Sequence, residues 1–192
     1  QYSHDLRLQH YVSFLNGWYC YKKMQGYSNS LSDLSDVFLL RTSEAYLNLA
    51  EAAACAGEEA TARTALAALR QRRIDQAYYD PSELNSLTGE ELVRFAREER
   101  RRELCLEGHR WFDLRRYRVA AQYPEEVILE HTHINKAFNE SLGMNEVLWT
   151  RKYTLVSDDP AWVLPLPQEE IDKNTGMINN PRNERSYENV NE

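Results

Sequence analysis

The sequence lacks the features that would place it in a bilayer or on a nucleic acid. Its longest apolar runs, such as Val37–Leu40, are far shorter than the ~20 residues that a helix needs to span a membrane. It has no excess of positive charge, because 30 acidic residues outnumber 23 basic ones and the formal net charge is −7. This balance argues against a general nucleic-acid partner and against an anionic membrane surface. Gly-rich phosphate loops and a GxSxG nucleophile motif are also missing.

Cysteine is scarce as well. Cys20, Cys55 and Cys105 form no CxxC motif and are widely spaced. An odd, scattered set of this kind is not a disulfide framework. We therefore interpret these residues as small packed thiols.

The chain is long enough for one domain with a sizeable core, or for a large part of one. It opens at QYSHDLRLQH, without a Met or an export leader, so we expect a fragment of a longer protein or a processed product. The predicted organisation is a loop-rich lead-in of irregular structure or short strands over 1–36, two helical hairpins over 37–121, an irregular region with short helices over 122–181, and a polar tail over 182–192.

A helical hairpin is predicted from Arg41 to Arg73. Tyr46, Leu49, Ala50 and Ala53 recur at the spacing of one helix face, and Gly57 is expected to end the helix in the left-handed conformation. A second helix starts directly after it. The spacing is similar to one tetratricopeptide unit, although a solenoid would need several copies.

A second hairpin is predicted after a connecting loop. Thr88 and Glu91 match a capping box, the helix that follows runs to about Glu107, and Gly108 separates it from a helix over roughly 109–121. The predicted fold class is therefore mainly α, with tetratricopeptide-like helical hairpins and extensive irregular loops.

The most unusual stretch is REERRRELCLEGHRWFDLRR, from Arg97 to Arg116. Glu99 and Glu103 fall on the apolar stripe of the third helix, and the fourth helix carries Arg115 and Arg118 on one stripe. We predict that Glu103 pairs with Arg115 and Glu99 with Arg118 across the hairpin, as structural ion pairs. A helix-turn-helix DNA reader fits less well, because its turn is longer and its domain is usually basic. An active site built on His109 has no nucleophile nearby.

Four blocks of the sequence resemble the C-terminal half of the SusD/RagB family of nutrient-binding outer-membrane lipoproteins of Bacteroidetes. In order from Arg41 to Pro181 they are RTSEAYLNLAEAAACAG, ALAALRQRR, LTGEELVRFAREERRRELCLEGHRWFDLRR and WVLPLPQEEIDKNTGMINNP. The family's N-terminal half, with its signal peptide and lipidated cysteine, is not in this sequence. The usual Asn-Pro near the end is here Asn174-Thr175.

The resemblance implies a surface-exposed outer-membrane protein, held by a lipid anchor outside this fragment. It implies a partner, a SusC-type TonB-dependent transporter, to which glycans or peptides are handed. It implies neither catalysis nor a cofactor. It does not assign ligand contacts, because the matching blocks are the structural ones.

Ligand contacts are expected from loop aromatics, since a flat ring packs against the apolar face of a pyranose. The candidates are Trp18, Tyr19, Tyr78 and Tyr79. Trp149 and Trp162 lie among aliphatic residues, and we assign them to the core.

Two other chemistries have weaker signals. Glu130, His131 and His133 could contribute to a zinc site, but no further ligand follows at a useful spacing, so no metal is predicted. Asp158 and Asp159 precede a proline in an apparent turn, where acids are common for backbone reasons. The alternatives to glycan binding are a tetratricopeptide-like scaffold for protein partners and a surface glycoside hydrolase.

Overall fold

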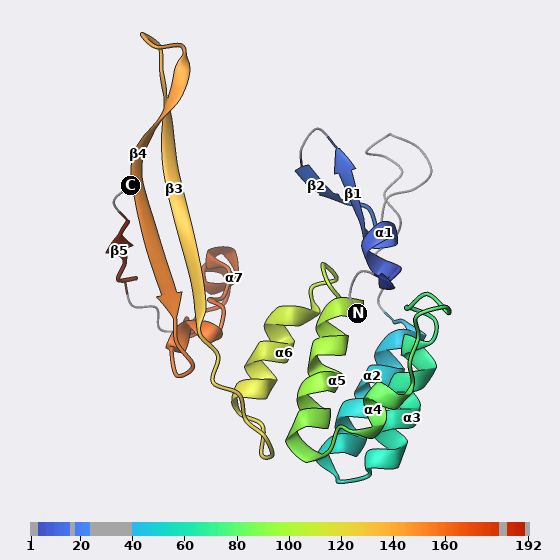
Figure 1. Cartoon of the computed structure of the whole chain (residues 1–192). Helices are drawn as coiled ribbons and strands as arrows, with labels where there is room; N and C mark the ends of the chain where they lie inside the picture. The colour runs from blue at the N-terminus through green and yellow to red at the C-terminus, as the bar shows by residue number, and fades with distance from the viewer. Residues whose placement is uncertain (1–3, 16–17, 24–39, 181–183, 191–192) are drawn as a thin grey trace. The chain divides into compact units, whose positions relative to one another are not determined.

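The computed structural model describes residues 4–15, 18–23, 40–180 and 184–190. The chain divides into two compact units (Figure 1). Unit 1 comprises residues 1–113 and 121–123, and unit 2 comprises residues 114–120 and 124–192. Helix α6 (His109–Arg118) begins in the first unit and ends in the second.

Unit 1 is built on three helices that lie side by side: α2 (Thr42–Cys55), α3 (Glu59–Arg70) and α5 (Gly89–Glu103) (Figure 1). A short helix, α4 (Ser82–Asn85), lies in the connection between α3 and α5. The core between these helices is rich in alanine, which allows the helix backbones to approach closely. It consists of Ala50, Ala53, Ala54, Ala62, Ala65, Leu66, Leu84, Leu92, Val93 and Ala96.

The helix boundaries confirm the predicted role of Gly57 and move the end of α5. Gly57, with φ +79°, follows α2, and Gly108, with φ +82°, lies between α5 and α6. Helix α5 ends at Glu103, before the expected Glu107. Only glycine adopts this left-handed conformation at little cost. The predicted capping box is wrong in its contacts. Thr88 is the N-cap of α5, but its side chain makes no cap hydrogen bond, and the Gly89 amide instead donates to Glu59 at 2.8 Å.

The N-terminal segment of unit 1 forms α1 (Arg7–Tyr11) and an antiparallel hairpin of β1 (Val12–Leu15) and β2 (Trp18–Tyr21). Before α1, Asp5 pairs with Ile74 in an isolated antiparallel bridge. The Leu6 amide donates to the Arg73 carbonyl at 2.8 Å. The lead-in is therefore attached to the chain that follows α3.

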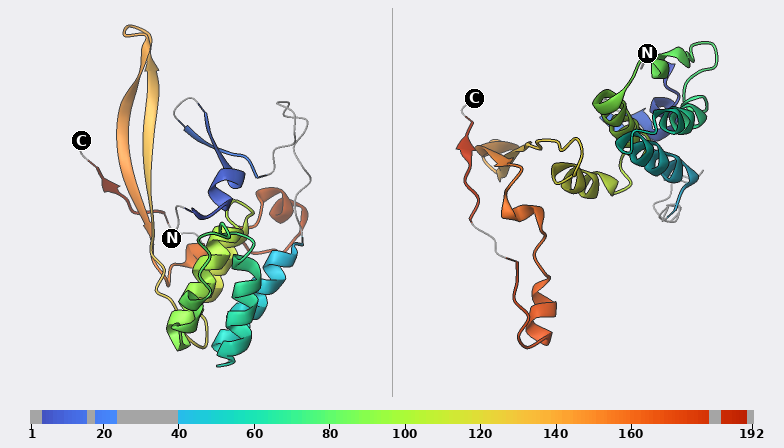
Figure 2. Two further views of the ribbon diagram at one scale, coloured as in Figure 1. Left: turned by 45° about the vertical axis from the view of Figure 1, so that its right-hand side comes forward. Right: turned by 90° about the horizontal axis from the view of Figure 1, so that it is seen from below.

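Unit 2 contains a long antiparallel pair, β3 (Leu129–Asn139) and β4 (Met144–Leu155), with a bulge between Asn135 and Lys136. A two-residue strand, β5 (Glu188–Asn189), joins the outer edge of β4. The left-hand view of Figure 2 shows β3 and β4 running together as a ribbon. A 3₁₀ turn over Pro160–Trp162 and helix α7 (Gln168–Lys173) complete the unit.

The prediction of an irregular region over 122–181 is therefore wrong for residues 129–155. Most of β3 is exposed on both faces, so its sequence lacks the alternation of apolar and polar residues that marks a half-buried strand. The assignment of Trp162 to the core is confirmed, since it is 1% exposed. Leu114, Tyr117, Val127 and Ala161 are further buried residues of this unit. Trp149 is only half-buried and lies on the sheet.

Candidate functional site

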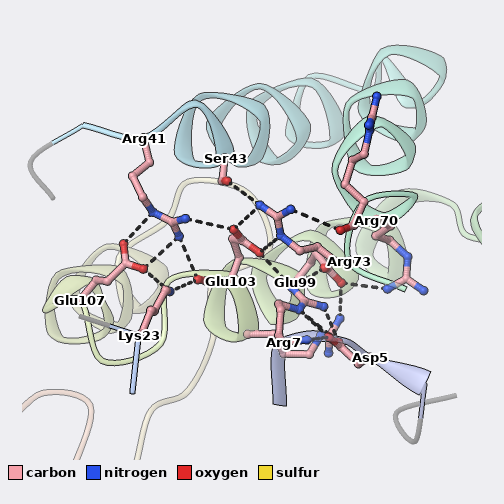
Figure 3. Close-up of polar contacts among 12 residues, drawn as sticks. Asp5, Arg7, Lys23, Arg41, Ser43, Arg70, Arg73, Glu99, Glu103 and Glu107 are labelled. Atoms are coloured by element: carbon pink, nitrogen blue, oxygen red, sulfur yellow. Dashed lines mark hydrogen bonds and ion pairs between the residues drawn. The ribbon is translucent and has the colours of Figure 1, made fainter. Parts of the chain in front are cut away.

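The arginine-rich stretch forms a buried ion network inside unit 1 (Figure 3). Its centre is Glu99, whose side chain has no solvent exposure. The Glu99 carboxylate lies 2.8 Å from Arg7, 2.8 Å from Arg70 and 2.7 Å from Arg102. These arginines come from α1, α3 and α5 itself, so one carboxylate joins three elements of the unit.

Glu103, one turn later on α5, holds a second set of partners (Figure 3). Arg73 donates to both of its oxygens at 2.8 and 2.9 Å, a two-pronged geometry that only arginine provides. Arg41 lies 3.3 Å from the same carboxylate. Glu107 continues the row through ion pairs with Lys23 and with Arg41, the latter at 2.9 Å.

The charges of this network reinforce one another. Burial by itself raises the pKa of Glu99, but the positive charges of Arg7, Arg102 and Arg70 outweigh it and lower that pKa to about 2. The pKa of Glu103 is likewise lowered: burial raises it, and the hydrogen bond and charge of Arg73 more than compensate. Both glutamates are therefore anionic at neutral pH, with several cations arranged around them.

Both glutamates form buried ion pairs, and their partners are arginines other than the two expected ones. Glu99 pairs with Arg7, Arg70 and Arg102, and Glu103 pairs with Arg7, Arg41 and Arg73. Arg118 donates to the Ser157 carbonyl and lies over the Trp162 ring at 5.4 Å.

The ion pair that does link α5 to the start of α6 is Arg100 with Asp113, at 2.8 Å. Sequence reasoning considered only the neighbouring helix, whereas Arg7, Arg41, Arg70 and Arg73 reach the network from segments far away in sequence. A usable signal was the basic end of α3, ALRQRR, which pattern reasoning attributes to the helix dipole alone.

An open groove of about 570 Å³ lies beside this network in unit 1. The antiparallel bridge between Asp5 and Ile74 brings its two sides together. Most of its polar lining consists of planar hydrogen-bonding groups, which suit the hydroxyl groups of a polar ligand. It is lined by Leu6, Gln71, Arg72, Ile74, Asp75 and Gln76.

Tyr78 lies two residues beyond this lining and stacks on His4. The two rings are 3.4 Å apart between centroids and only 4° from parallel. The Tyr78 side chain is 58% exposed, and its amide donates to the Asp75 carbonyl at 2.9 Å. An exposed, pre-positioned ring next to planar polar groups is the arrangement that sugar binding requires.

The other aromatic candidates are placed differently. Tyr79 is half-buried, and burial raises the pKa of its phenol. Trp18 and Tyr19 lie in β2, opposite Leu15 and Phe14. Their side chains lie outside the part of the chain that the structure describes.

Asp159 and Cys105 are the residues to consider for a hydrolase or a thiol enzyme, and their surroundings give little support to either. Asp159 accepts a hydrogen bond from the Ala161 amide at 2.8 Å and pairs with Arg185 at 2.6 Å, so it holds a turn. Cys105 lines a second groove of about 530 Å³, but burial raises the pKa of its thiol. A raised pKa keeps the thiol protonated and a poor nucleophile.

The His-x-His pair lies on β3 and faces away from the neighbouring carboxylate. His131 and His133 alternate with Glu130 along the strand, and Glu130 pairs with Lys152 at 2.6 Å. Within residues 4–15, 18–23, 40–180 and 184–190, no group of three or more His, Cys, Asp or Glu side chains is placed to hold a metal ion. No helix in those ranges is long and apolar enough to cross a membrane.

Comparison with known proteins identifies the family. The profile of the SusD family matches residues 10–182, which include most of each unit. The chain belongs to the SusD family. SusD-family proteins are in general non-catalytic nutrient-binding proteins associated with the outer-membrane surface. No curated protein matches this SusD-family chain.

Proposed function

We propose that this SusD-family protein binds extracellular glycans, or other nutrient oligomers, and delivers them to a SusC-type TonB-dependent transporter in the outer membrane. The observation that carries the proposal is the family match over residues 10–182. It acts without catalysis and without a cofactor, and a lipid anchor attaches it to the membrane. The transporter takes the ligand across the membrane.

The groove lined by Gln71, Asp75 and Gln76 is the proposed ligand site in unit 1. Tyr78, supported from behind by His4, offers its free face to a sugar ring. The Gln71 and Gln76 amides donate to and accept from hydroxyl groups, and the Asp75 carboxylate accepts from them. Trp18 and Tyr19, on β2, and Tyr79, next to Tyr78 in sequence, remain proposed contacts.

The buried ion network supports this role by making the site rigid. Arg7 is tied to Glu99 and Glu103, and the segment just before it forms one side of the groove. A groove that is already formed loses little conformational entropy on binding. Preorganisation of this kind suits a protein that must capture dilute nutrients.

The test uses the full-length lipoprotein. Glycan mixtures are incubated with it and examined both for binding and for hydrolysis products, and the protein is purified from membranes to identify co-purifying transporters. Binding without hydrolysis, together with a TonB-dependent transporter, is the expected outcome. Hydrolysis would favour a glycosidase. Capture of other proteins, with neither binding nor hydrolysis of glycans, would favour a protein-interaction scaffold.

A further inference from the structure

One face of the β3–β4–β5 sheet in unit 2 gathers aromatic side chains from all three segments around one arginine. Residues paired across an antiparallel sheet share a face, as does every second residue along a strand. His131 pairs with Tyr153 and His133 with Arg151. The Tyr187 ring, just before β5, lies 6.0 Å from that of Tyr153. We call this the aromatic face and define it by His131, His133, Trp149, Arg151, Tyr153 and Tyr187.

Arg151 is the centre of the aromatic face. Its guanidinium carbon lies 4.2 Å from the centroid of the Trp149 ring and 3.9 Å from that of the Tyr187 ring. Its Nε is buried without a hydrogen-bond partner, and no described carboxylate forms an ion pair with it. The rings fix the position of this cation, but nothing in the described part of unit 2 neutralises its charge.

On the opposite face of the same sheet, the cation is paired with carboxylates. Lys152, the next residue along β4, pairs with Glu130 at 2.6 Å and lies 4.0 Å from Glu188. The acidic side chains of this part of the sheet therefore lie on the face where the lysine is. Across residues 129–135, 149–155 and 187–189, the positions that share the aromatic face include no carboxylate. In a chain of net charge −7, this segregation leaves one locally cationic surface.

We infer that the aromatic face binds an acidic oligosaccharide, one whose sugar rings carry carboxylates. Flat rings such as those of Trp149 and Tyr153 pack against the apolar faces of sugars. The guanidinium of Arg151 donates in a two-pronged manner to a carboxylate, and the exposed imidazoles of His131 and His133 add further donors.

Two other occupants fit the same surface less well. A neutral glycan presents hydroxyl groups that also donate, and the aromatic face has no carboxylate to accept from them. An apolar protein surface would bury the charge of Arg151 without a counterion, which is costly. The inference rests on the proposed function, whose ligand class it narrows, and it concerns a surface of unit 2 rather than the groove of unit 1.

The test measures the affinity of the full-length protein for trigalacturonate and for its methyl ester by titration calorimetry. The ester keeps the sugar rings and removes the charges. The acid is expected to bind at least about tenfold more tightly than the ester, as a charge-assisted hydrogen bond implies. Added salt is expected to weaken binding of the acid but not of the ester. Arg151→Gln should remove this preference, while Lys152→Gln, one residue away on the opposite face, should keep it. Both variants should unfold at the wild-type temperature.

Equal affinity for acid and ester, or an unchanged preference in Arg151→Gln, overturns the inference but leaves the proposed function standing, since a glycan is still bound. Failure to bind either probe also overturns it. The proposed function is then judged separately, by co-purification of a transporter and by glycan binding that depends on Tyr78. A preference lost in Trp149→Ala as well as in Arg151→Gln supports the aromatic face as the site.

Discussion

The guanidinium of Arg7 lies 2.8 Å from the carboxylate of Glu99, and both side chains are almost wholly buried. This contact joins the N-terminal segment to the middle of α5. It is one of three ion pairs on a single carboxylate, so Glu99 holds α1, α3 and α5 together. When the Glu99 carboxylate is removed, its buried arginine partner has no replacement for it, because water does not reach the site.

Glu99→Gln is expected to lower the free energy of unfolding by about 3–5 kcal/mol, because buried arginines lose their counterion. Urea unfolding followed by circular dichroism measures the change. The matched control is Glu98→Gln: its side chain is 49% exposed and lies 3.4 Å from Arg101, so the loss should be below about 1 kcal/mol. Equal losses in the two variants would show that the buried network contributes no special stability.

Acid should destabilise unit 1 through the same carboxylate. The pKa of Glu99 is about 2 in the folded protein against an ordinary value of 4.5, so the unfolded chain takes up the proton more readily. The stabilisation is thus complete above the ordinary pKa and lost as pH falls towards the folded one, and it amounts to roughly 3 kcal/mol. Urea midpoints measured from neutral pH down to the folded pKa should fall less steeply in Glu99→Gln. If the urea midpoints of the two proteins fell in parallel with pH, Glu99 would not be the source of the acid sensitivity.

Trp162 is expected to be the main packing residue of unit 2. It is 1% exposed, and its Nε1 donates to the Val156 carbonyl at 2.7 Å. Trp162→Ala should cost about 3–5 kcal/mol in thermal unfolding, whereas Trp162→Phe loses chiefly the hydrogen bond and should cost about 1–3 kcal/mol. Leu164→Ala, at a position that is 58% exposed, serves as the control and should change stability by less than about 0.5 kcal/mol.

Tyr78 is expected to act through its ring rather than its hydroxyl. Tyr78→Ala should weaken binding of a glycan ligand about tenfold, and Tyr78→Phe should leave it nearly unchanged, since stacking depends on the flat face. Titration calorimetry on the full-length protein provides the measurement. Tyr46→Ala, which removes an exposed tyrosine from α2, is the control. A similar loss in the Phe variant would assign the contact to the hydroxyl instead.

The helices of unit 1 were predictable because local rules determine them. Apolar residues at helical spacing indicated α2 and α5. Gly57 marked the end of α2 and Gly108 the break between α5 and α6, and both have positive φ angles. The short helices expected within 122–181 include α7. These features depend on residues within a few positions of one another, so a single sequence contains the necessary information.

The β3–β4 hairpin and the aromatic face were not predictable in the same way. Strands exposed on both faces carry no periodic apolar pattern, and it is the register that brings His133 opposite Arg151. The Arg151 cation lies between Trp149 and Tyr187 because β5 returns to the edge of β4. That return joins segments more than thirty positions apart in the printed sequence, and no local rule specifies it.

The amino-acid sequence by itself determined the family, the helical segments of unit 1 and the presence of buried acids on α5, since each follows from local spacing or from a recognisable block. Only the tertiary structure decided which arginines neutralise those acids and which rings surround Arg151. The physical reason is that a charge buried in a fold takes the partner that packing brings within about 3 Å, and packing brings together segments that lie far apart along the chain.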